Sequence, residues 1–458
     1  MWNLVRFSGI YIKNEKGRDT MINSQFSIPG TKKCMLESTY WLNKLETGET
    51  LLMDKRAIED FNKKTLKKVN TMCNISQHKE SLTREELQHI LGAYTISKDI
   101  RYDIKGREIK QDFYTVLIQN TNLEEIQDIN TVKFGISVKN TRLRSFPTEE
   151  SIFKDSGCIE FDLFQETECS ALDAVAILHK SSDRNWFYIQ MYNYNGWVKA
   201  CDIAIAKNKE EIFNYLDTDH FLMVIGNKIG TQFNHYDERV SRKDFYMGTR
   251  IPLEIDPISN IGNQASLLHH VVKIPVRDNE GFLEFRNALI SHKEDATLGY
   301  LPYTRATILN QAFKLLGDRY DWGNKNNGRD CSSFLMCVYK TVGIILPRNG
   351  NHQEIGEGIS YAFDKNATLE ERIKIFEKVK PGAAIFSAGH VMLYIGEDDG
   401  NYYMIHDFNS YGKRCEDDTL EKIYVNGIAV TSTLLLTSKG NKYIEIFSSI
   451  LQFELIIK

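Results

Sequence analysis

The last third of the chain has two stretches in which apolar residues recur at helical spacing, followed by short apolar runs. The first stretch lies between Thr304, a good N-cap, and Gly317, which favours a helix end. The second follows Asp330 and closes at Gly343. The short runs span residues 383–386, 390–395, 402–406 and 444–447. Helices followed by strands of an antiparallel sheet predict an α+β fold.

The middle of the chain consists of short alternating runs separated by Ser, Asp, Asn and Gly. Between residues 131 and 206 the runs span 132–138, 174–178, 186–191 and 196–198. A second set between residues 219 and 303 spans 221–225, 248–255, 269–274 and 299–301. Several short strands in so little chain favour small barrels, so we predict two β-barrels in tandem. We expect Trp186 and Trp197 in the core of the first barrel.

The first 130 residues are mixed in pattern and mostly helical. Residues 54–68 carry apolar side chains at roughly helical spacing, and Thr83 is followed three residues later by Glu86, the pattern of a capped helix start. At 458 residues the chain is too long for one ordinary domain. We predict a helical N-terminal leader region (1–130), a first barrel (131–206), a second barrel (207–303) and an α+β domain (304–458).

The balance of charge excludes broad classes of partner. Lysine and arginine together number 57, aspartate and glutamate 61, and the net charge is −4. No global field therefore attracts nucleic acid or an anionic membrane, and no apolar run is long enough to span a membrane. Residues Met1–Ser8 lack the basic start and apolar stretch of a secretion leader, so we expect a cytoplasmic protein. A leader missing from this sequence would instead place the protein in the cell envelope or outside the cell.

The cysteines and histidines show no metal or disulfide pattern. The eight cysteines, at positions 34, 73, 158, 169, 201, 331, 337 and 415, include no CxxC pair and have no regular spacing. The histidines lack the spacing of metal ligands. We expect neither a metal nor another cofactor. The sequence does not indicate an oligomeric state.

The sequence Asp330-Cys331-Ser332-Ser333 places a cysteine at the start of a predicted helix, after a turn rich in glycine and asparagine. The positive end of the helix dipoles favours the thiolate of such a cysteine, whereas Asp330 as the capping residue opposes it. A lone cysteine in this place is more often a small buried hydrophobic residue.

Two histidines on predicted strands change this interpretation. His390 begins an apolar strand after the turn 387–389, and His406 closes the next strand. His390 could take the proton of the Cys331 thiol, and His406 could hold the imidazole in the required tautomer. A cysteine, a histidine and a polar third residue are what a cysteine peptidase needs.

These residues resemble the NlpC-type papain-like cysteine peptidases, which cut bacterial cell-wall peptides. The residues that match are Leu316-Gly317, Tyr320-Asp321-Trp322-Gly323, Asp330-Cys331-Ser332-Ser333, Gly343-Ile344, Leu346-Pro347-Arg348-Asn349, Gln353, Lys380-Pro381-Gly382, Gly389-His390-Val391 and Ile405-His406.

Upstream segments resemble the two bacterial SH3-like barrels that precede the peptidase in one subgroup of this family. For the first barrel they are Arg144-Ser145-Phe146-Pro147-Thr148, Phe161-Asp162-Leu163-Phe164-Gln165, Leu178-His179-Lys180-Ser181-Ser182-Asp183 and Gly196-Trp197-Val198; for the second they are Met247-Gly248-Thr249 and Pro252-Leu253. The resemblance implies a papain-like catalytic domain behind two SH3-like domains.

The resemblance also implies roles for single residues. Cys331 would be the nucleophile, His390 the general base and then the acid, and His406 the residue that orients His390. Tyr320 would line the site and help the Cys331 backbone N–H to stabilise the oxyanion.

Substrate selection would rest on the residues beside the nucleophile. In relatives that cut small stem peptides, the aspartate before the cysteine binds the free amino group of the substrate. Asp330 stands there, with Ser332 as its neighbour, and a carboxylate that binds an ammonium selects a free N-terminus. One residue departs from the pattern: some relatives carry a small hydroxyl residue where this chain has Gly350.

The function implied is hydrolysis of the γ-D-glutamyl–diamino acid bond in murein peptides with a free N-terminal L-Ala, through a thioester intermediate, in peptide recycling. The diamino acid would be diaminopimelate or lysine. An exported endopeptidase acting on intact wall is the nearest alternative. A catalytically inert protein that binds wall peptides and an acyltransferase on the same scaffold are further alternatives, which the Cys–His–His set and the amine-binding aspartate respectively disfavour.

Overall fold

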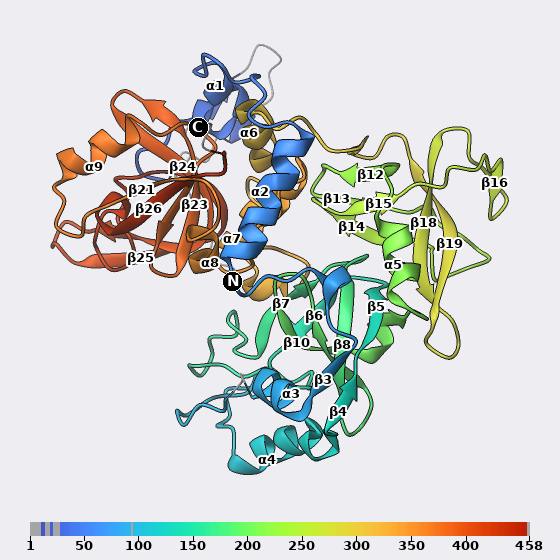
Figure 1. The fold of residues 1–458 in the computed structure, drawn as a ribbon. Helices are drawn as coiled ribbons and strands as arrows, with labels where there is room; N and C mark the ends of the chain where they lie inside the picture. Colours follow the sequence, from blue (N-terminus) through green and yellow to red (C-terminus); the bar gives the residue numbers. More distant parts are fainter. Residues whose placement is uncertain (1–10, 14–18, 22–27, 93–94, 456–458) are drawn as a thin grey trace, which may run out of the picture.

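A computed structural model describes residues 11–13, 19–21, 28–92 and 95–455 of the chain. Residues Met1–Ser8, on which the expectation of a leaderless chain rests, lie outside the described residues. The C-terminal sheet with its helices, a first β region (residues 133–205) and a second β region (221–298) form three bodies around the helix α2 (Figure 1). No helix among the described residues is long and apolar enough to cross a membrane.

The C-terminal region, residues 304–455, combines helices with one antiparallel sheet, which confirms the predicted α+β class, although α9 and α10 lie between strands rather than before them. The helices are α6 (Arg305–Phe313), η5 (Trp322–Asn324), α7 (Cys331–Lys340), α8 (Gly350–Glu354), α9 (Leu369–Phe376) and α10 (Tyr443–Ile446). The strands are β21 (Ile359–Ala362), β22 (Ala384–Ser387), β23 (His390–Asp398), β24 (Asn401–Arg414), β25 (Leu420–Ser432) and β26 (Phe447–Gln452), in the order β21-β26-β22-β23-β24-β25.

Helix α7 begins where the sequence predicted. The Asp330 carboxylate accepts a hydrogen bond from the Ser333 backbone N–H, and the Ser333 hydroxyl accepts one from the Asp330 backbone N–H. This reciprocal cap satisfies two donors that a helix start leaves open. The apolar face of α7, including the fully buried Phe334 and Val338, packs into the main core against β23 and β24. The helix start is therefore held at the edge of the sheet.

Two predictions for the C-terminal region need correction. The run 444–447 is not a strand, because Tyr443–Ile446 form the short helix α10 and β26 starts at Phe447. A short apolar run does not distinguish a buried helical turn from a strand. Strand β25 was not predicted, because its first half mixes charged and apolar residues and is largely exposed, and only its second half is buried.

The first β region is a seven-stranded antiparallel sheet that contains every predicted run. Its strands are β5 (Lys133–Ser137), β6 (Thr141–Arg144), β7 (Gln165–Cys169), β8 (Ala174–Lys180), β9 (Trp186–Gln190), β10 (Asn195–Lys199) and β11 (Ile203–Ile205), joined by η4 (Ala200–Asp202). The order β11-β5-β8-β9-β10-β6-β7 is open at both ends, so the hydrogen bonding does not close a barrel. Trp186 and Trp197 are buried in its core, as predicted.

The second β region follows α5 (Lys209–Leu216) and consists of several small sheets. Its strands are β12 (Phe221–Val224), β13 (Lys228–Gly230), β14 (Asp244–Tyr246), β15 (Arg250–Pro252), β16 (Asn260–Ile261), β17 (Gln264–Ala265), β18 (His269–Arg277), β19 (Leu283–Ser291) and β20 (Ala296–Leu298). The prediction of a strand at 299–301 was wrong. Gly299 has a φ of +72°, and Tyr300 is 45 % exposed, so the chain turns away after β20.

The N-terminal region contains several short helices and two small two-stranded sheets. Its elements are β1 (Tyr11–Lys13), β2 (Asp19–Met21), η1 (Lys33–Leu36), α1 (Ser38–Leu42), α2 (Lys55–Lys68), η2 (Ile75–Gln77), β3 (Ser81–Thr83), α3 (Arg84–Leu91), α4 (Gln111–Asn120), η3 (Leu123–Glu125) and β4 (Ile129–Thr131). The cap formed by Thr83 and Glu86 is present. Trp41 is fully buried in the core of the C-terminal region, where it packs against Tyr403.

The first β region touches the C-terminal region beside α7. The Gln165 side chain donates a hydrogen bond to the Gly323 carbonyl at 2.9 Å, and a Cβ at Gly323 would meet the Gln165 side chain at 2.8 Å. Phe161, in the loop between β6 and β7, lies with its ring 6.2 Å from Tyr320 and 5.6 Å from Trp322, between ring centroids. These contacts place the first β region directly beside the candidate active site.

Candidate active site

Cys331 is the first residue of α7 and is partly exposed. Its thiol faces the backbone N–H of Val391, the residue after His390, so the cysteine and the predicted base lie side by side. Burial and the neighbouring Asp330 carboxylate raise the pKa of the thiol to about 12, and the Val391 N–H opposes that shift. In the resting site, burial and the Asp330 charge therefore outweigh the stabilisation of the thiolate that was expected from the helix dipoles.

A chain of hydrogen bonds leads from His390 through His406 to Thr431. His390 Nε2 lies 2.8 Å from His406 Nδ1, and His406 Nε2 lies 2.9 Å from the Thr431 hydroxyl. His406 is fully buried, and burial together with His390 lowers its pKa well below the ordinary value, so its ring is neutral.

A neutral His406 couples the tautomer of one ring to that of the other. If His390 Nε2–H donates to His406 Nδ1, then His406 Nε2–H donates to Thr431, and each ring uses one donor and one acceptor. His390 Nδ1 is then unprotonated and remains for the thiol. Thr431 was not identified from the sequence, because it lies on the unpredicted strand β25.

Aromatic rings hold His406 in place. Its ring is stacked on Phe408 with centroids 4.1 Å apart and planes 4° apart, and the Tyr443 ring meets it edge-on at 5.3 Å. Packing on two sides leaves His406 little freedom to rotate. This rigidity suits a residue whose role is to orient its neighbour.

Burial lowers the pKa of His390 to about 4, and the Asp330 carboxylate opposes that shift. Together with the raised pKa of Cys331, this makes the resting pair a neutral thiol beside a neutral imidazole. The arrangement supports proton transfer during attack rather than a preformed ion pair.

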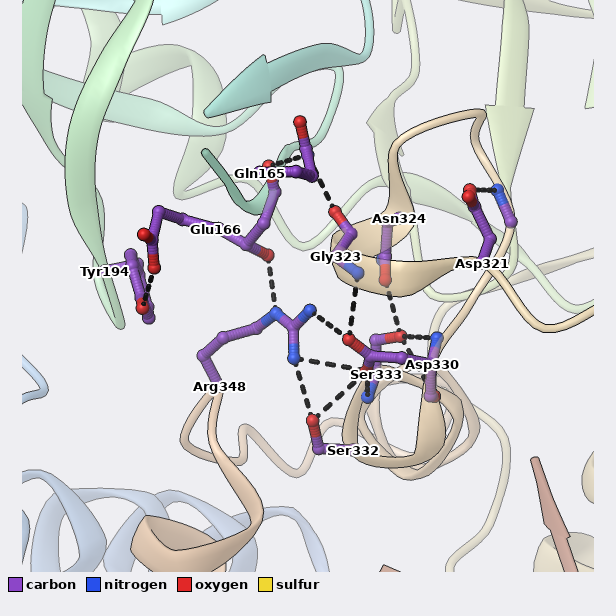
Figure 2. A network of polar contacts seen from close by, with 12 residues as sticks. Gln165, Glu166, Tyr194, Asp321, Gly323, Asn324, Asp330, Ser332, Ser333 and Arg348 are labelled. Carbon is purple, nitrogen blue, oxygen red and sulfur yellow. Dashed lines mark hydrogen bonds and ion pairs between the residues drawn. The ribbon is translucent and has the colours of Figure 1, made fainter. Parts of the chain in front are cut away.

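Asp330 forms a buried ion pair with Arg348 (Figure 2). The guanidinium donates to one Asp330 oxygen at 2.6 Å and to the other at 3.2 Å, and the Gly323 backbone N–H donates at 3.3 Å. Burial would raise the pKa of Asp330, but Arg348 and the capping hydrogen bonds hold it below its ordinary value. Asp330 is the carboxylate that was expected to bind the substrate amine. In the resting site both of its oxygens therefore already accept hydrogen bonds.

Ser332 takes part in the same network. Its hydroxyl donates to Asp330 at 3.2 Å and accepts from Arg348 at 2.8 Å, and the side chain is buried. The third partner of Arg348 is the Thr167 hydroxyl on β7, which accepts from Nε at 2.5 Å. Arg348 thus links the helix start to the first β region.

Tyr320 lies in the loop that precedes α7, the helix that begins with Cys331. Burial, followed by the Asp330 and Cys331 charges, raises the pKa of its phenol far above the ordinary value. The hydroxyl therefore keeps its proton and is a hydrogen-bond donor. Its backbone N–H donates to the Asn426 carbonyl at 2.9 Å, which fixes the loop before α7 to strand β25.

Glu166 and Tyr194 extend this network from the first β region, and neither was identified from the sequence. The Tyr194 hydroxyl donates to the Glu166 carboxylate at 2.6 Å, and this carboxylate points toward Tyr194 rather than toward the Arg348 guanidinium (Figure 2). Burial raises the pKa of Glu166, and Tyr194 and Arg348 oppose that shift. One signal was present: strand β7 alternates, with Gln165, Thr167 and Cys169 buried, so Glu166 faces the other way.

Asp407 is a further carboxylate that sequence analysis missed. It directly follows His406 and is fully buried, and among the described residues neither carboxylate oxygen has a hydrogen-bond partner. Burial and the Asp330 charge raise its pKa to about 9, so it is a neutral acid at physiological pH. Its negative form would raise the pKa of Cys331.

Comparison with protein families identifies the C-terminal region. Residues 317–426 match the model of the NlpC/P60 family. The chain carries an NlpC/P60 domain. Cys331, His390 and His406 all lie within the matched residues. A second match, to an SH3 domain of the SH3b1 type, covers residues 151–199 and includes Glu166 and Tyr194.

One solved structure resembles most of the arrangement, and a second matches more weakly. A structure titled as a novel NlpC/P60 endopeptidase from Photobacterium damselae subsp. piscicida matches with a TM-score of 0.72 at 18% identity, covering 91% of this chain and 97% of that one. An NlpC/P60 family protein from Bacillus cereus matches with a TM-score of 0.42 at 19% identity, covering 63% of this chain and 82% of that one. The first likeness shows that the fold extends beyond the NlpC/P60 domain. No curated protein matches the chain.

The match assigns residues 317–426 to a family of cysteine peptidases that act on peptidoglycan. Among the described residues no group of three or more His, Cys, Asp or Glu side chains could hold a metal ion. The chemistry available at the site is that of the thiol, the two histidines and the buried network around Asp330.

Proposed function

We propose that this protein hydrolyses the γ-D-glutamyl–diamino acid bond of murein peptides that carry a free N-terminal L-Ala. The observation that carries the proposal is the half-buried carboxylate of Glu166 in the SH3 domain, which feels the charge of Arg348, the ion-pair partner of Asp330. Such a site favours a short peptide whose N-terminal ammonium lies at a fixed distance from the bond that is cut.

The charges around Asp330 support ammonium binding. Asp330 and Arg348 neutralise each other, so the ion pair alone has no net charge for a cation. Glu166 has Tyr194 as its hydrogen-bond partner and no ion pair within 4.0 Å among the described residues. An ammonium placed between Glu166 and Asp330 would find one uncompensated carboxylate, and a neutral acylated amine would leave Glu166 without a counter-charge.

In the proposed reaction, the Cys331 sulfur attacks the γ-carbonyl carbon of D-Glu while His390 Nδ1 takes the thiol proton. The imidazolium that forms is stabilised by His406, whose Nδ1 accepts from His390 and whose orientation Thr431 fixes. The proton then passes to the nitrogen of the leaving diamino acid, and a thioester remains. Water activated by His390 hydrolyses the thioester and restores the thiol.

The oxyanion formed during attack needs donors that are already in place. The backbone N–H of Cys331 belongs to the first turn of α7 and has no partner within the helix. The Tyr320 hydroxyl, whose raised pKa keeps it protonated, is the second donor we propose. The Cys331 N–H lies at the positive end of the helix dipole.

The contact between Phe161 and the Tyr320–Trp322 segment supports a site that is closed at one end. A closed end excludes glycan-linked stems and accepts short free peptides, so we propose a role in recycling wall peptides, in the cytoplasm. We further propose that residues 207–303 form a second, divergent SH3-like domain. An exported enzyme acting on intact wall would instead have to accept a blocked amino terminus.

The proposal is tested by mass spectrometry of L-Ala-γ-D-Glu-diaminopimelate and L-Ala-γ-D-Glu-L-Lys after incubation with purified protein. Each tripeptide is supplied free and N-acylated. We expect release of L-Ala-D-Glu from the free forms alone, and no release by Cys331→Ala, whose circular dichroism should match the parent. Equal cleavage of the acylated forms would favour the exported enzyme, and binding without cleavage would favour an inert wall-peptide-binding protein.

A further inference from the structure

A cavity of about 260 Å³ lies behind α7, on the side of the helix away from Cys331. The first β region, the second β region and the C-terminal region all contribute to its wall. From α7 come Ser333 and Lys340, and from the first β region Glu168, Asp173 and Tyr192. The volume is room for roughly nine water molecules. The cavity is therefore large enough for a small organic molecule.

Opposite charges face this space without pairing. Among the described residues, no ion pair within 4.0 Å involves Lys340, Glu168 or Asp173. Asp173 accepts a hydrogen bond from the Ser170 backbone N–H at 3.0 Å, and Glu168 accepts from the Asn140 amide at 2.9 Å. Charges removed from water are normally paired, so charges of both signs that line one cavity without a close ion pair point to a group that bridges them.

The protonation states agree with this interpretation. Burial works against a charged Lys340, but Tyr192 and Asp173 raise its pKa above the ordinary value, so it is an ammonium. Burial raises the pKa of Glu168 to about 8 and raises that of Asp173 as well, because no cation is close enough to compensate either carboxylate fully. A cationic group of a ligand would supply the counter-charge that these carboxylates lack.

Tyr192 adds a donor at the Lys340 end of the cavity. The Lys340 ammonium lies 5.1 Å from the centroid of the Tyr192 ring, and the buried Tyr192 hydroxyl has no hydrogen-bond partner among the described residues. A buried hydroxyl without a partner is uncommon and costs free energy. An ammonium and a phenol side by side suit a carboxylate, whereas Asp173 and Glu168 suit an ammonium.

We propose that this cavity binds a small free α-amino acid, with its carboxylate on Lys340 and Tyr192 and its ammonium on Asp173 and Glu168. The ligand would connect all three bodies of the structure. It would also lie against Ser333, which caps α7 together with Asp330 and donates a hydrogen bond to Asn324 at 2.7 Å. Binding would therefore stabilise α7, the helix that carries Cys331, through the face opposite Cys331.

The test measures binding to the full chain carrying Cys331→Ala by calorimetry and thermal unfolding, and needs no cleavage. The probes are L-alanine, L-lysine and diaminopimelate, with propionate and propylamine as the two separate halves of the ligand. We expect at least one amino acid to bind and to raise the unfolding temperature, with each half binding at least about tenfold more weakly. Equal binding of propionate or propylamine, or no binding by any probe, would overturn the proposal.

Variants locate the site. Lys340→Met should reduce amino-acid affinity at least about tenfold, because a charge-assisted hydrogen bond is lost. Tyr192→Phe removes only the hydroxyl and serves if Lys340→Met does not fold, with an expected loss of about fivefold. Lys374→Met, at an exposed lysine of α9, is the matched control and should bind as the parent does. Affinity that none of the cavity variants changes would place the ligand elsewhere and overturn the proposal.

Discussion

At the scale of single residues, Asp407 lowers the free energy of unfolding by an amount that depends on pH. The ordinary pKa of its carboxyl is 3.8, and the folded chain raises it to about 9 through burial and the charges of Asp330, Asp318 and Asp321, with Arg329 opposing. Below pH 4 both the folded and the unfolded chain hold this proton. Between pH 4 and pH 9 only the folded chain holds it, so the free energy of unfolding falls as pH rises.

Asp407→Asn removes this titration and should stabilise the protein more at pH 8 than at pH 5.5. The difference between variant and parent should grow with pH by at most about 1.4 kcal/mol per pH unit. Urea unfolding at a series of pH values measures it. A gain that is the same at both pH values would mean that the carboxyl of Asp407 does not titrate in this way.

Thr431 gives a second prediction at this scale. Thr431→Val keeps the shape of the side chain but removes the partner of His406 Nε2, so the imidazole of His390 is less well oriented. We expect kcat for the free tripeptide to fall by roughly tenfold to a hundredfold with little change in KM. Thr433→Val is the control, because the buried Thr433 hydroxyl has no hydrogen-bond partner among the described residues. Equal losses in the two variants would count against an orienting role.

At the scale of elements, the start of α7 depends on Arg348. Arg348→Met leaves the Asp330 carboxylate buried without a counter-charge, so the free energy of unfolding should fall by about 3–5 kcal/mol. Arg319→Met breaks an exposed pair with Glu160 and should cost about 1 kcal/mol or less. Denaturant unfolding compares the two variants. Similar losses would indicate that the buried pair contributes no more than a surface pair.

Periodicity predicted the elements that carry the candidate nucleophile and base, because these elements are amphipathic or wholly apolar. The helix from Asp330 and the strand from His390 are both present. Prediction failed at the run 444–447 and at β25, where packing against the rest of the sheet decides the conformation. Thr431 was missed for that reason, since its strand has no simple alternation.

At the scale of the whole molecule, substrate selection is shared between two domains. Glu166→Gln keeps the shape of the side chain but removes its charge, so we expect KM for free L-Ala-γ-D-Glu-diaminopimelate to rise about tenfold or more, with kcat little changed. Glu150→Gln, at an exposed residue, is the control. Steady-state kinetics measure both variants. A KM equal to that of the parent would exclude Glu166 from amine binding.

No local pattern could have predicted that Glu166 and Tyr194 lie near enough to Arg348 to feel its charge. Their proximity depends on how the SH3 domain docks on the NlpC/P60 domain, through contacts such as Gln165 to Gly323 and Thr167 to Arg348. The matching segment Phe161–Gln165 ended one residue before the glutamate. Pairings between domains are set by tertiary contacts, which periodicity and propensity do not encode.

The N-terminal segment also bears on how the catalytic third of the chain can be studied. Trp41 fills the core of the NlpC/P60 domain, and Lys32, Lys44 and Tyr40 all bond to Asp398, at the tip of the hairpin β23–β24 that carries both histidines. A fragment that begins at residue 304 would expose this core and free the hairpin. Loss of activity in such a fragment would therefore reflect a damaged scaffold, and would say nothing about whether the SH3 domain selects the substrate.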